Sequence, residues 1–180
     1  ETYLSMVRDQ FASYVLQVGG LVENKLRLTM AELRTMPKQT QITKHCCIQG
    51  WSGVAEWSGV PLGHIVGLCR PLPIARYIVF YAFDNKSTSE PHAQGPGHFY
   101  GTIRLELADD PQTILAYEMN GEPLPIDHGA PLRLRLETQL GFTMVKYIRA
   151  IEFVESYANI GKGQGGWRED YQYFSQEAGI

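Results

Sequence analysis

The apolar run at residues 75–83 (ARYIVFYAF) is the feature that most constrains the fold. It is rich in aromatic and β-branched side chains, with prolines just upstream and a polar segment downstream. A near-continuous apolar run of this composition is typical of a β-strand. The chain therefore needs further strands and helices to cover it.

Strand-type patterns recur along the chain, whereas only two segments favour a helix. Further strands are predicted at residues 14–20, 26–29, 40–48 (a buried strand), 99–107, 131–137 and 146–154, with residues 113–119 compatible with either state. A helix is predicted after Thr29, with Glu32 completing a capping box, and another over residues 61–68. Strands and helices do not alternate regularly, so a Rossmann-type sheet is disfavoured. The pattern predicts a β-dominated α+β domain with a mixed sheet and few short helices.

Glycine, proline and polar residues mark the connections. Residues 51–59, rich in Gly, Ser and Trp, are predicted to form a loop, and residues 84–97 a long polar one. Residues 156–180 are predicted to be a tail that packs on the domain or on a partner. With 180 residues, we expect one domain over residues 1–155 followed by this tail.

The charge balance disfavours one class of function. Sixteen basic and 19 acidic residues give a net charge of −3, so binding of nucleic acid through bulk positive charge is disfavoured. No apolar run is long enough to predict a membrane span. The chain begins at Glu1 without a charged-then-apolar leader, so we expect a trimmed or processed form.

The three cysteines do not predict a disulfide framework. Cys46, Cys47 and Cys69 are odd in number and form no CxxC motif. On a strand, His45 and Cys47 would face one side and Cys46 the other. Cys47 is then a candidate thiolate ligand or nucleophile beside His45. Taken alone, however, the adjacent residues Cys46 and Cys47 are more often two small buried side chains, and this alternative stays open.

A second polar cluster surrounds a Gly-Ala-Pro turn. His128 precedes the turn, Arg133 follows it, and Arg135 and Lys146 add positive charge to an acidic chain. Arginine suits bidentate binding of phosphate, so the cluster indicates a small anionic ligand. A turn with a surface arginine explains the same residues in isolation. Residues 161–166 (GKGQGG) lack the spacing of a phosphate-binding loop and favour a flexible tail.

Three ordered blocks resemble the sulfite oxidase family of molybdenum enzymes, most closely its bacterial methionine-sulfoxide-reductase branch. Residues 45–62 (HCCIQGWSGVAEWSGVPL) resemble the family's cysteine segment, with Cys47 on the family cysteine. Residues 115–133 (LAYEMNGEPLPIDHGAPLR) and 141–147 (GFTMVKY) resemble two further segments at matching spacing. The resemblance covers residues 14–155 and implies the family's mixed α+β molybdopterin-binding fold.

The resemblance also implies contacts with a molybdenum–molybdopterin cofactor. Cys47 would be the catalytic residue and the one protein thiolate on the metal, whose other sulfurs would come from the molybdopterin dithiolene. His128 and Arg133 would hold the pterin phosphate. The remaining expected cofactor contacts are Met144, Val145, Lys146 and, through its backbone, Ala82.

Two departures from the family pattern stand out. The methionine-sulfoxide-reductase branch carries a glutamate where this chain has Gln49, and a neutral amide cannot act as a base. The family's cofactor-binding stretch upstream of the cysteine is also missing here. Either an N-terminal part is lost, or the cofactor is bound through fewer contacts.

The implied function is a molybdenum oxidoreductase that performs oxygen-atom transfer or a coupled two-electron step. The substrate would be a small molecule or a protein methionine, electrons would leave singly to a haem cytochrome, and the location would be periplasmic. Trp51, Trp57 and residues 84–97 would shape substrate access. Two alternatives stay open: a truncated or non-catalytic cofactor-binding module of the same fold, and a thiol enzyme that uses Cys47 with His45.

Overall fold

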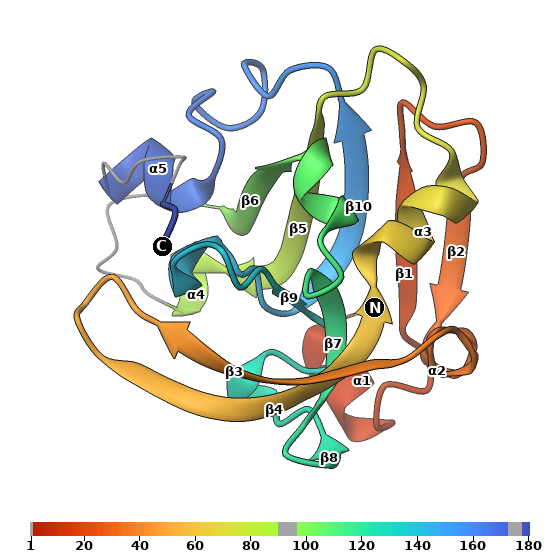
Figure 1. Ribbon diagram of the computed structural model, residues 1–180, viewed down its shortest axis with the longest axis vertical. Coiled ribbons are helices and arrows are strands. Elements are labelled where there is room, and N and C mark those ends of the chain that lie inside the picture. The colour runs from red at the N-terminus through yellow and green to blue at the C-terminus, as the bar shows by residue number, and fades with distance from the viewer. Residues whose placement is uncertain (1, 90–96, 173–177) are drawn as a thin grey trace.

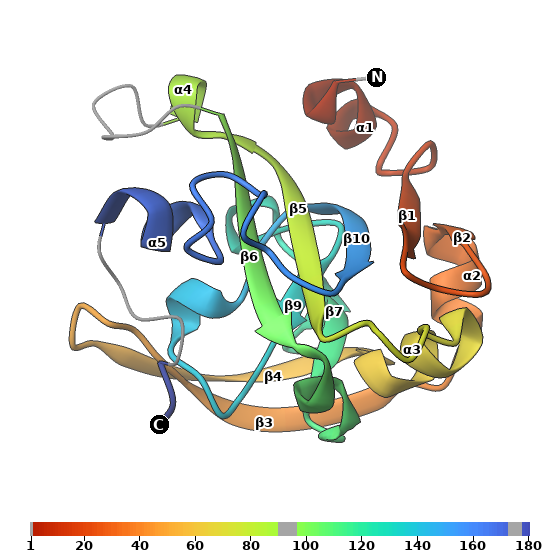
Figure 2. The ribbon, with the colours of Figure 1, turned by 90° about the horizontal axis from the view of Figure 1, so that it is seen from above.

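The computed structural model describes residues 2–89, 97–172 and 178–180. Two β-sheets face each other, as seen from above in Figure 2, and short helices lie around them (Figure 1). The predicted β-dominated α+β class with a mixed sheet is confirmed.

The first sheet is mixed and has the strand order β2-β1-β10-β5-β6. Its strands are β1 (Val15–Gly20), β2 (Leu26–Thr29), β5 (Tyr77–Asn85), β6 (His98–Arg104) and β10 (Ile148–Val154). β1 and β10 run parallel, and the other neighbours are antiparallel. The apolar run forms β5, which lies between β10 and β6. Ile78, Val79 and Phe80 are fully buried there, as a strand covered on both faces requires.

The second sheet is antiparallel, with the order β3-β4-β7-β8 and β9 also paired to β7. Its strands are β3 (Gln39–Cys46), β4 (Ser52–Pro61), β7 (Ile114–Met119), β8 (Glu122–Pro123) and β9 (Arg133–Arg135). The expectation that β3 is buried is wrong. Among the described residues only β4 pairs with it, so it is an edge strand and most of its side chains are partly exposed. β3 and β4 form a long hairpin that runs along one side of the molecule (Figure 2).

The helices are short. They are α1 (Tyr3–Arg8), α2 (Met30–Thr35), α3 (Leu62–Cys69), α4 (Lys86–Ser89) and α5 (Trp167–Gln172), with 3-10 turns η1 (Leu105–Asp109), η2 (Ile126–His128) and η3 (Gly141–Thr143). Both predicted helices are confirmed, as α2 and α3. The capping box is present: the Glu32 N–H donates to Thr29 Oγ1 at 3.2 Å, and the Thr29 N–H donates to Glu32 Oε2 at 2.7 Å. No helix in the described parts of the chain is long and apolar enough to cross a bilayer.

Residues 51–59 lie almost entirely in β4 rather than in the loop predicted for them. Their glycine and serine content is misleading, because β4 is paired on both sides, with β3 and with β7. Gly59 is required by this pairing: a Cβ there would lie 2.0 Å from the Leu115 carbonyl oxygen. It sits at the irregularity that follows Ser58, a place where strands commonly carry glycine.

The alternation at residues 131–137 is confirmed, but its arginine side is not at the surface. The leucines at positions 132, 134 and 136 enter the main core between the sheets. Arg133 and Arg135 project to the other side, where they are only 5% and 0% exposed. Their guanidinium carbons lie 4.8 Å and 4.3 Å from the centre of the Trp57 ring on β4. The alternative of a turn with a surface arginine is therefore wrong, because Trp57 of β4, a strand distant in the sequence, covers both arginines.

The segment after β10 packs back on the first sheet. Trp167 is 1% exposed and joins a small core with Tyr100. Asp170 Oδ2 accepts the Tyr100 hydroxyl at 2.6 Å. The Asp170 carboxylate also accepts the backbone N–H groups of Lys162 and Gln164, at 3.0 Å and 3.2 Å. One carboxylate therefore holds the GKGQGG segment, for which a flexible tail was expected.

Candidate functional site

A cavity of about 830 Å³ lies between the tip of the β3–β4 hairpin and a facing wall that contains His128, Arg133 and Lys146. Its size is within the range of cofactor and small-molecule sites. The walls come from both sheets, η2, η3 and α5. The lining residues used below are His45, Cys47, Gln49, Trp51, Trp57, Asp84, Lys86, Asp127, His128, Arg133, Gly141, Met144, Lys146, Tyr147 and Arg168.

Cys47 is presented by a tight turn at the hairpin tip. The Cys47 N–H donates to the Trp51 carbonyl at 2.9 Å, and the Gly50 N–H donates to the Cys47 carbonyl at 3.0 Å. Gly50 has a φ of 90°, which favours glycine. The Gln49 N–H points at Cys47 Sγ, 3.5 Å away. A backbone donor aimed at the sulfur is a suitable partner for a thiolate ligand.

The predicted sharing of one face by His45 and Cys47 is confirmed. Both line the cavity, whereas Cys46 does not. Gln49 lies beside them, and its Oε1 accepts the indole N–H of Trp51 at 3.4 Å. The neutral amide is therefore fixed next to the candidate ligand, in the place where the resembled branch has a carboxylate.

The candidate phosphate-binding residues lie together on the facing wall. Arg133 Nη1 donates to the His128 carbonyl at 3.0 Å, and Lys146 Nζ donates to the Asp127 carbonyl at 3.1 Å. Gly129, with a φ of 110°, lets these segments meet. A Cβ at this position would lie 2.8 Å from Lys146 Cβ and 3.3 Å from Arg133 Cβ.

The electrostatics of this wall favour an anion. Burial, and after it the charge of Arg135, lowers the pKa of Arg133 to about 9. Burial, and after it the charge of Arg133, lowers the pKa of Lys146. Four lysine or arginine side chains line the cavity against two carboxylates, those of Asp84 and Asp127. A bound anion would relieve the crowding of positive charge.

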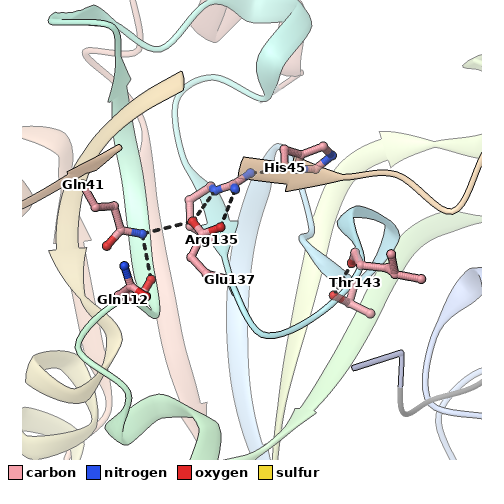
Figure 3. A network of polar contacts seen from close by, with 7 residues as sticks. Gln41, His45, Gln112, Arg135, Glu137 and Thr143 are labelled. Carbon is pink, nitrogen blue, oxygen red and sulfur yellow. Dashed lines mark hydrogen bonds and ion pairs between the residues drawn. The ribbon is translucent and has the colours of Figure 1, made fainter. Parts of the chain in front are cut away.

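A buried polar network supports the hairpin behind the cavity (Figure 3). Arg135 donates through Nε and Nη2 to the two carboxylate oxygens of Glu137, at 2.9 Å and 2.7 Å. Its Nη1 lies 2.9 Å from His45 Nδ1. Gln41 Nε2 donates to Glu137 at 3.0 Å and to the Gln112 carbonyl at 2.9 Å. Burial, followed by the charge of Arg135, lowers the pKa of His45 to about 4, so its imidazole is neutral.

The structure brings most of the predicted site residues together. Cys47, His128, Arg133, Met144 and Lys146 all line the cavity. Ala82 and Val145 are buried and lie outside its lining. Of the expected access residues, Trp51, Trp57 and Asp84 line the cavity, whereas positions 90–96 of the expected long loop lie outside the described residues.

Sequence reasoning missed the role of Trp57 as the platform for both buried arginines. A signal was present: the tetrad Trp51-Ser-Gly-Val recurs six residues later as Trp57-Ser-Gly-Val. An even spacing puts both tryptophans on the same face of a strand, and both line the cavity. Tyr147, another lining residue that was missed, has a φ of 57°, which no local motif indicated.

Comparisons with known proteins identify the family that this fold and cavity belong to. The family described as oxidoreductase molybdopterin binding domain matches residues 4–159. A putative protein-methionine-sulfoxide reductase subunit YedZ1 from Azospira oryzae is 35% identical over 162 residues, which cover 90% of this chain and 55% of the relative. The protein-methionine-sulfoxide reductase catalytic subunit MsrP of Xanthomonas axonopodis is 34% identical over 81% of this chain and 46% of its own length.

The fold has a counterpart among solved structures. The sulfane dehydrogenase SoxCD of Paracoccus pantotrophus superposes with a TM-score of 0.66 at 23% identity, over 81% of this chain and 39% of that one. The chain therefore belongs to the family of molybdopterin-binding oxidoreductase domains. It spans about half the length of the curated relatives that it matches.

The residues present fit a molybdopterin cofactor. The cavity has a thiol on the hairpin side and cations on the facing wall, which suits a group with a metal at one end and a phosphate at the other. Arg133 Nε and Trp57 Nε1 are buried donors without a hydrogen-bond partner among the described residues. Buried donors are nearly always satisfied, so these two unpaired donors mark the contact between Arg133 and Trp57 as a polar region of the wall.

Proposed function

We propose that this domain holds molybdenum–molybdopterin through Cys47 and uses it to reduce a sulfoxide of the methionine-sulfoxide class. The observation that carries the proposal is the cavity itself, in which the Cys47 thiol faces a cationic wall built from separate chain segments. The two curated relatives named above are described as protein-methionine-sulfoxide reductase subunits, which supports the choice of substrate. A periplasmic location and a haem cytochrome as electron partner belong to the same proposal.

The proposed contacts divide the cofactor between two walls. Cys47 would bind the metal, whereas the phosphate would lie against His128, Arg133 and Lys146, with Met144 beside them. Val145 would act indirectly. Its carbonyl accepts the Leu134 N–H at 2.8 Å, and this bond fixes the positions of the neighbouring lining residues Met144 and Lys146.

Ala82 would also act indirectly. It pairs with Ile148 across the sheet, and the next residue, Phe83, donates its N–H to the Tyr147 carbonyl at 2.8 Å. These contacts fix the lining residue Tyr147. Both buried positions would therefore shape the wall rather than touch the cofactor.

The reaction converts a sulfoxide, two electrons and two protons into a thioether and one water molecule. When bound, the cofactor supplies the two-electron redox chemistry that oxygen-atom transfer needs, and the electrons come singly from the haem partner. The chain's own residues orient the reactants and exclude water. Gln49 can position the substrate but cannot supply a proton. Burial and the charge of Arg133 lower the pKa of Lys146, and a phosphate held against this side chain would stabilise its ammonium form.

Paired cysteine variants test this proposal. The full chain is produced in a host that makes the cofactor, analysed for molybdenum and pterin, and assayed for methionine sulfoxide reduction with a reduced dye. Cys47→Ser should lose nearly all turnover. Cys46→Ser is the matched control, because that thiol lies outside the lining, and it should keep both metal and turnover.

Three other outcomes would contradict the proposal in different ways. Wild-type turnover in Cys47→Ser would overturn the assignment of the metal ligand. A loaded but inert wild type would favour the non-catalytic module. Turnover without molybdenum, blocked by iodoacetamide at Cys47, would favour the thiol enzyme.

A further inference from the structure

Arg135 is a fully buried cation that, among the described residues, forms hydrogen bonds with the side chains of Glu137 and His45 (Figure 3). Nε and Nη2 are used by Glu137, and Nη1 meets His45 Nδ1 at 2.9 Å. A guanidinium has donors only, so Nδ1 must be the acceptor in this contact. A ring nitrogen that accepts a hydrogen bond carries no hydrogen. The single hydrogen of the neutral imidazole therefore lies on Nε2.

Nε2 is the ring nitrogen of His45 that Arg135 leaves unoccupied. No described residue forms a hydrogen bond with Nε2, and the ring lines the same cavity as Cys47. The Gly141 backbone packs against this side of the ring, where only a glycine fits: a Cβ there would lie 2.2 Å from His45 Nε2 and 2.3 Å from His45 Cε1. The Trp51 ring lies on another side, with its centre 5.6 Å from that of the imidazole. The histidine is thus anchored at Nδ1, whereas Nε2 has no hydrogen-bond partner among the described residues.

We infer that Arg135 fixes His45 as the Nε2–H tautomer and that this N–H donates a hydrogen bond to the substrate oxygen beside Cys47. The inferred hydrogen bond to the substrate rests on the proposed function, in which the substrate is a sulfoxide. A sulfoxide oxygen is a strong hydrogen-bond acceptor. His45 is then a catalytic residue that touches the substrate, and Arg135 is a positioning residue that acts through it. A donor held ready without reorganisation favours the state in which charge on the oxygen grows.

The tautomer can be observed independently of activity. The full chain is labelled with ¹⁵N-histidine, with and without cofactor, and long-range proton–nitrogen correlation spectra are recorded at neutral pH. Five histidines give signals, and His45→Gln identifies the one of interest. We expect one species that carries its proton on Nε2. A signal from the Nδ1–H form, or exchange between the two tautomers, would overturn the inference.

A double variant shows whether Arg135 is the cause. Arg135→Met combined with Glu137→Gln removes the buried ion pair as a unit, so that no lone charge is left to unfold the chain. The His45 signal should then become a mixture of tautomers. A signal that stays purely Nε2–H would show that Arg135 is not the positioning residue. Arg34→Met is the matched control, since that side chain is exposed, and it should leave the His45 signal unchanged.

Kinetics test the contact with the substrate. His45→Phe keeps an aromatic ring without a donor, and we expect a loss in kcat/KM of about 10²-fold, mostly in kcat, with unchanged molybdenum and pterin content. His45→Gln, whose amide N–H replaces the donor, should recover activity to within about tenfold of wild type. Equal activity of the Phe variant and wild type, or loss of cofactor from it, would overturn the substrate contact. If the loaded wild type reduces no sulfoxide, the proposed function and the substrate contact fail, and the spectra still decide whether Arg135 fixes the tautomer.

Discussion

We expect Arg133 to affect the stability of the cofactor-free chain and the binding of the cofactor in opposite directions. It is 5% exposed, and the neighbouring charge of Arg135 opposes its own. Arg133→Met should therefore stabilise the cofactor-free chain, by about 1–2 kcal/mol, because it removes a buried charge that forms no ion pair with the described residues. The same change should strongly reduce bound cofactor, since the main candidate grip on its phosphate is lost.

Urea unfolding of the cofactor-free protein and the ratio of molybdenum to protein measure these two effects. Arg27→Met, an exposed arginine on β2, should change neither. A variant that is less stable than wild type yet fully loaded would show that Arg133 has a structural role only.

Single residues of the site could be predicted from the sequence when a local pattern carried them. The alternation of side chains on a strand placed His45 and Cys47 on one face, and the turn before Arg133 indicated an anion site. Trp57 could not be assigned in this way, because its role depends on contact with a strand more than 70 residues later along the chain. Its burial against the arginines of β9 is a long-range effect that no local window contains.

At the level of elements, prediction succeeded where local physics decides and failed where pairing does. The capping box alone defined the start of α2, and the apolar run alone defined β5. β4 contains glycines and serines that favour a loop, but hydrogen bonds to β3 and β7 override that preference. The burial of the β9 arginines was not predicted for a similar reason. The polar face of a strand is expected to meet water unless another element covers it.

Helix α5 carries an acidic group whose burial makes stability depend on pH. Burial raises the pKa of Glu169 from 4.5 to about 7, and the charge of Asp170 acts in the same direction. Between these values the folded chain binds more protons than the unfolded chain, so this residue's contribution to stability falls as the pH rises from about 4.5 to about 7. Glu169→Gln removes the charge, and should make the protein more stable than wild type by about 1–3 kcal/mol at pH 8, with little difference at pH 4.5.

Urea unfolding at several pH values gives the difference between wild type and Glu169→Gln. Glu155→Gln, at an exposed position, is the matched control and should follow the wild-type curve. A constant difference between Glu169→Gln and wild type at all pH values would mean that the carboxylate is not the source of the dependence.

The whole molecule assembles its cavity from distant parts of the chain. The hairpin of the second sheet supplies Cys47, the β9 region supplies Arg133, and α5 supplies Arg168. We therefore propose that the folded unit continues beyond residue 155 through α5, rather than ending before a tail. Trp167 is the residue on which this extension depends, because it is 1% exposed and packs on Val79 of β5.

Trp167→Ala tests whether α5 is part of the folded unit. Loss of a fully buried tryptophan should lower the free energy of unfolding by about 3–5 kcal/mol. Cofactor content should also fall, because α5 brings Arg168 to the cavity. Trp51→Ala is the matched control for stability: this tryptophan is 55% exposed at the hairpin tip, so its loss should cost about 1 kcal/mol or less. If Trp167→Ala destabilised the protein no more than Trp51→Ala does, residues beyond 155 would be a tail. A large loss would instead make the first sheet, the cavity and α5 one cooperative structure.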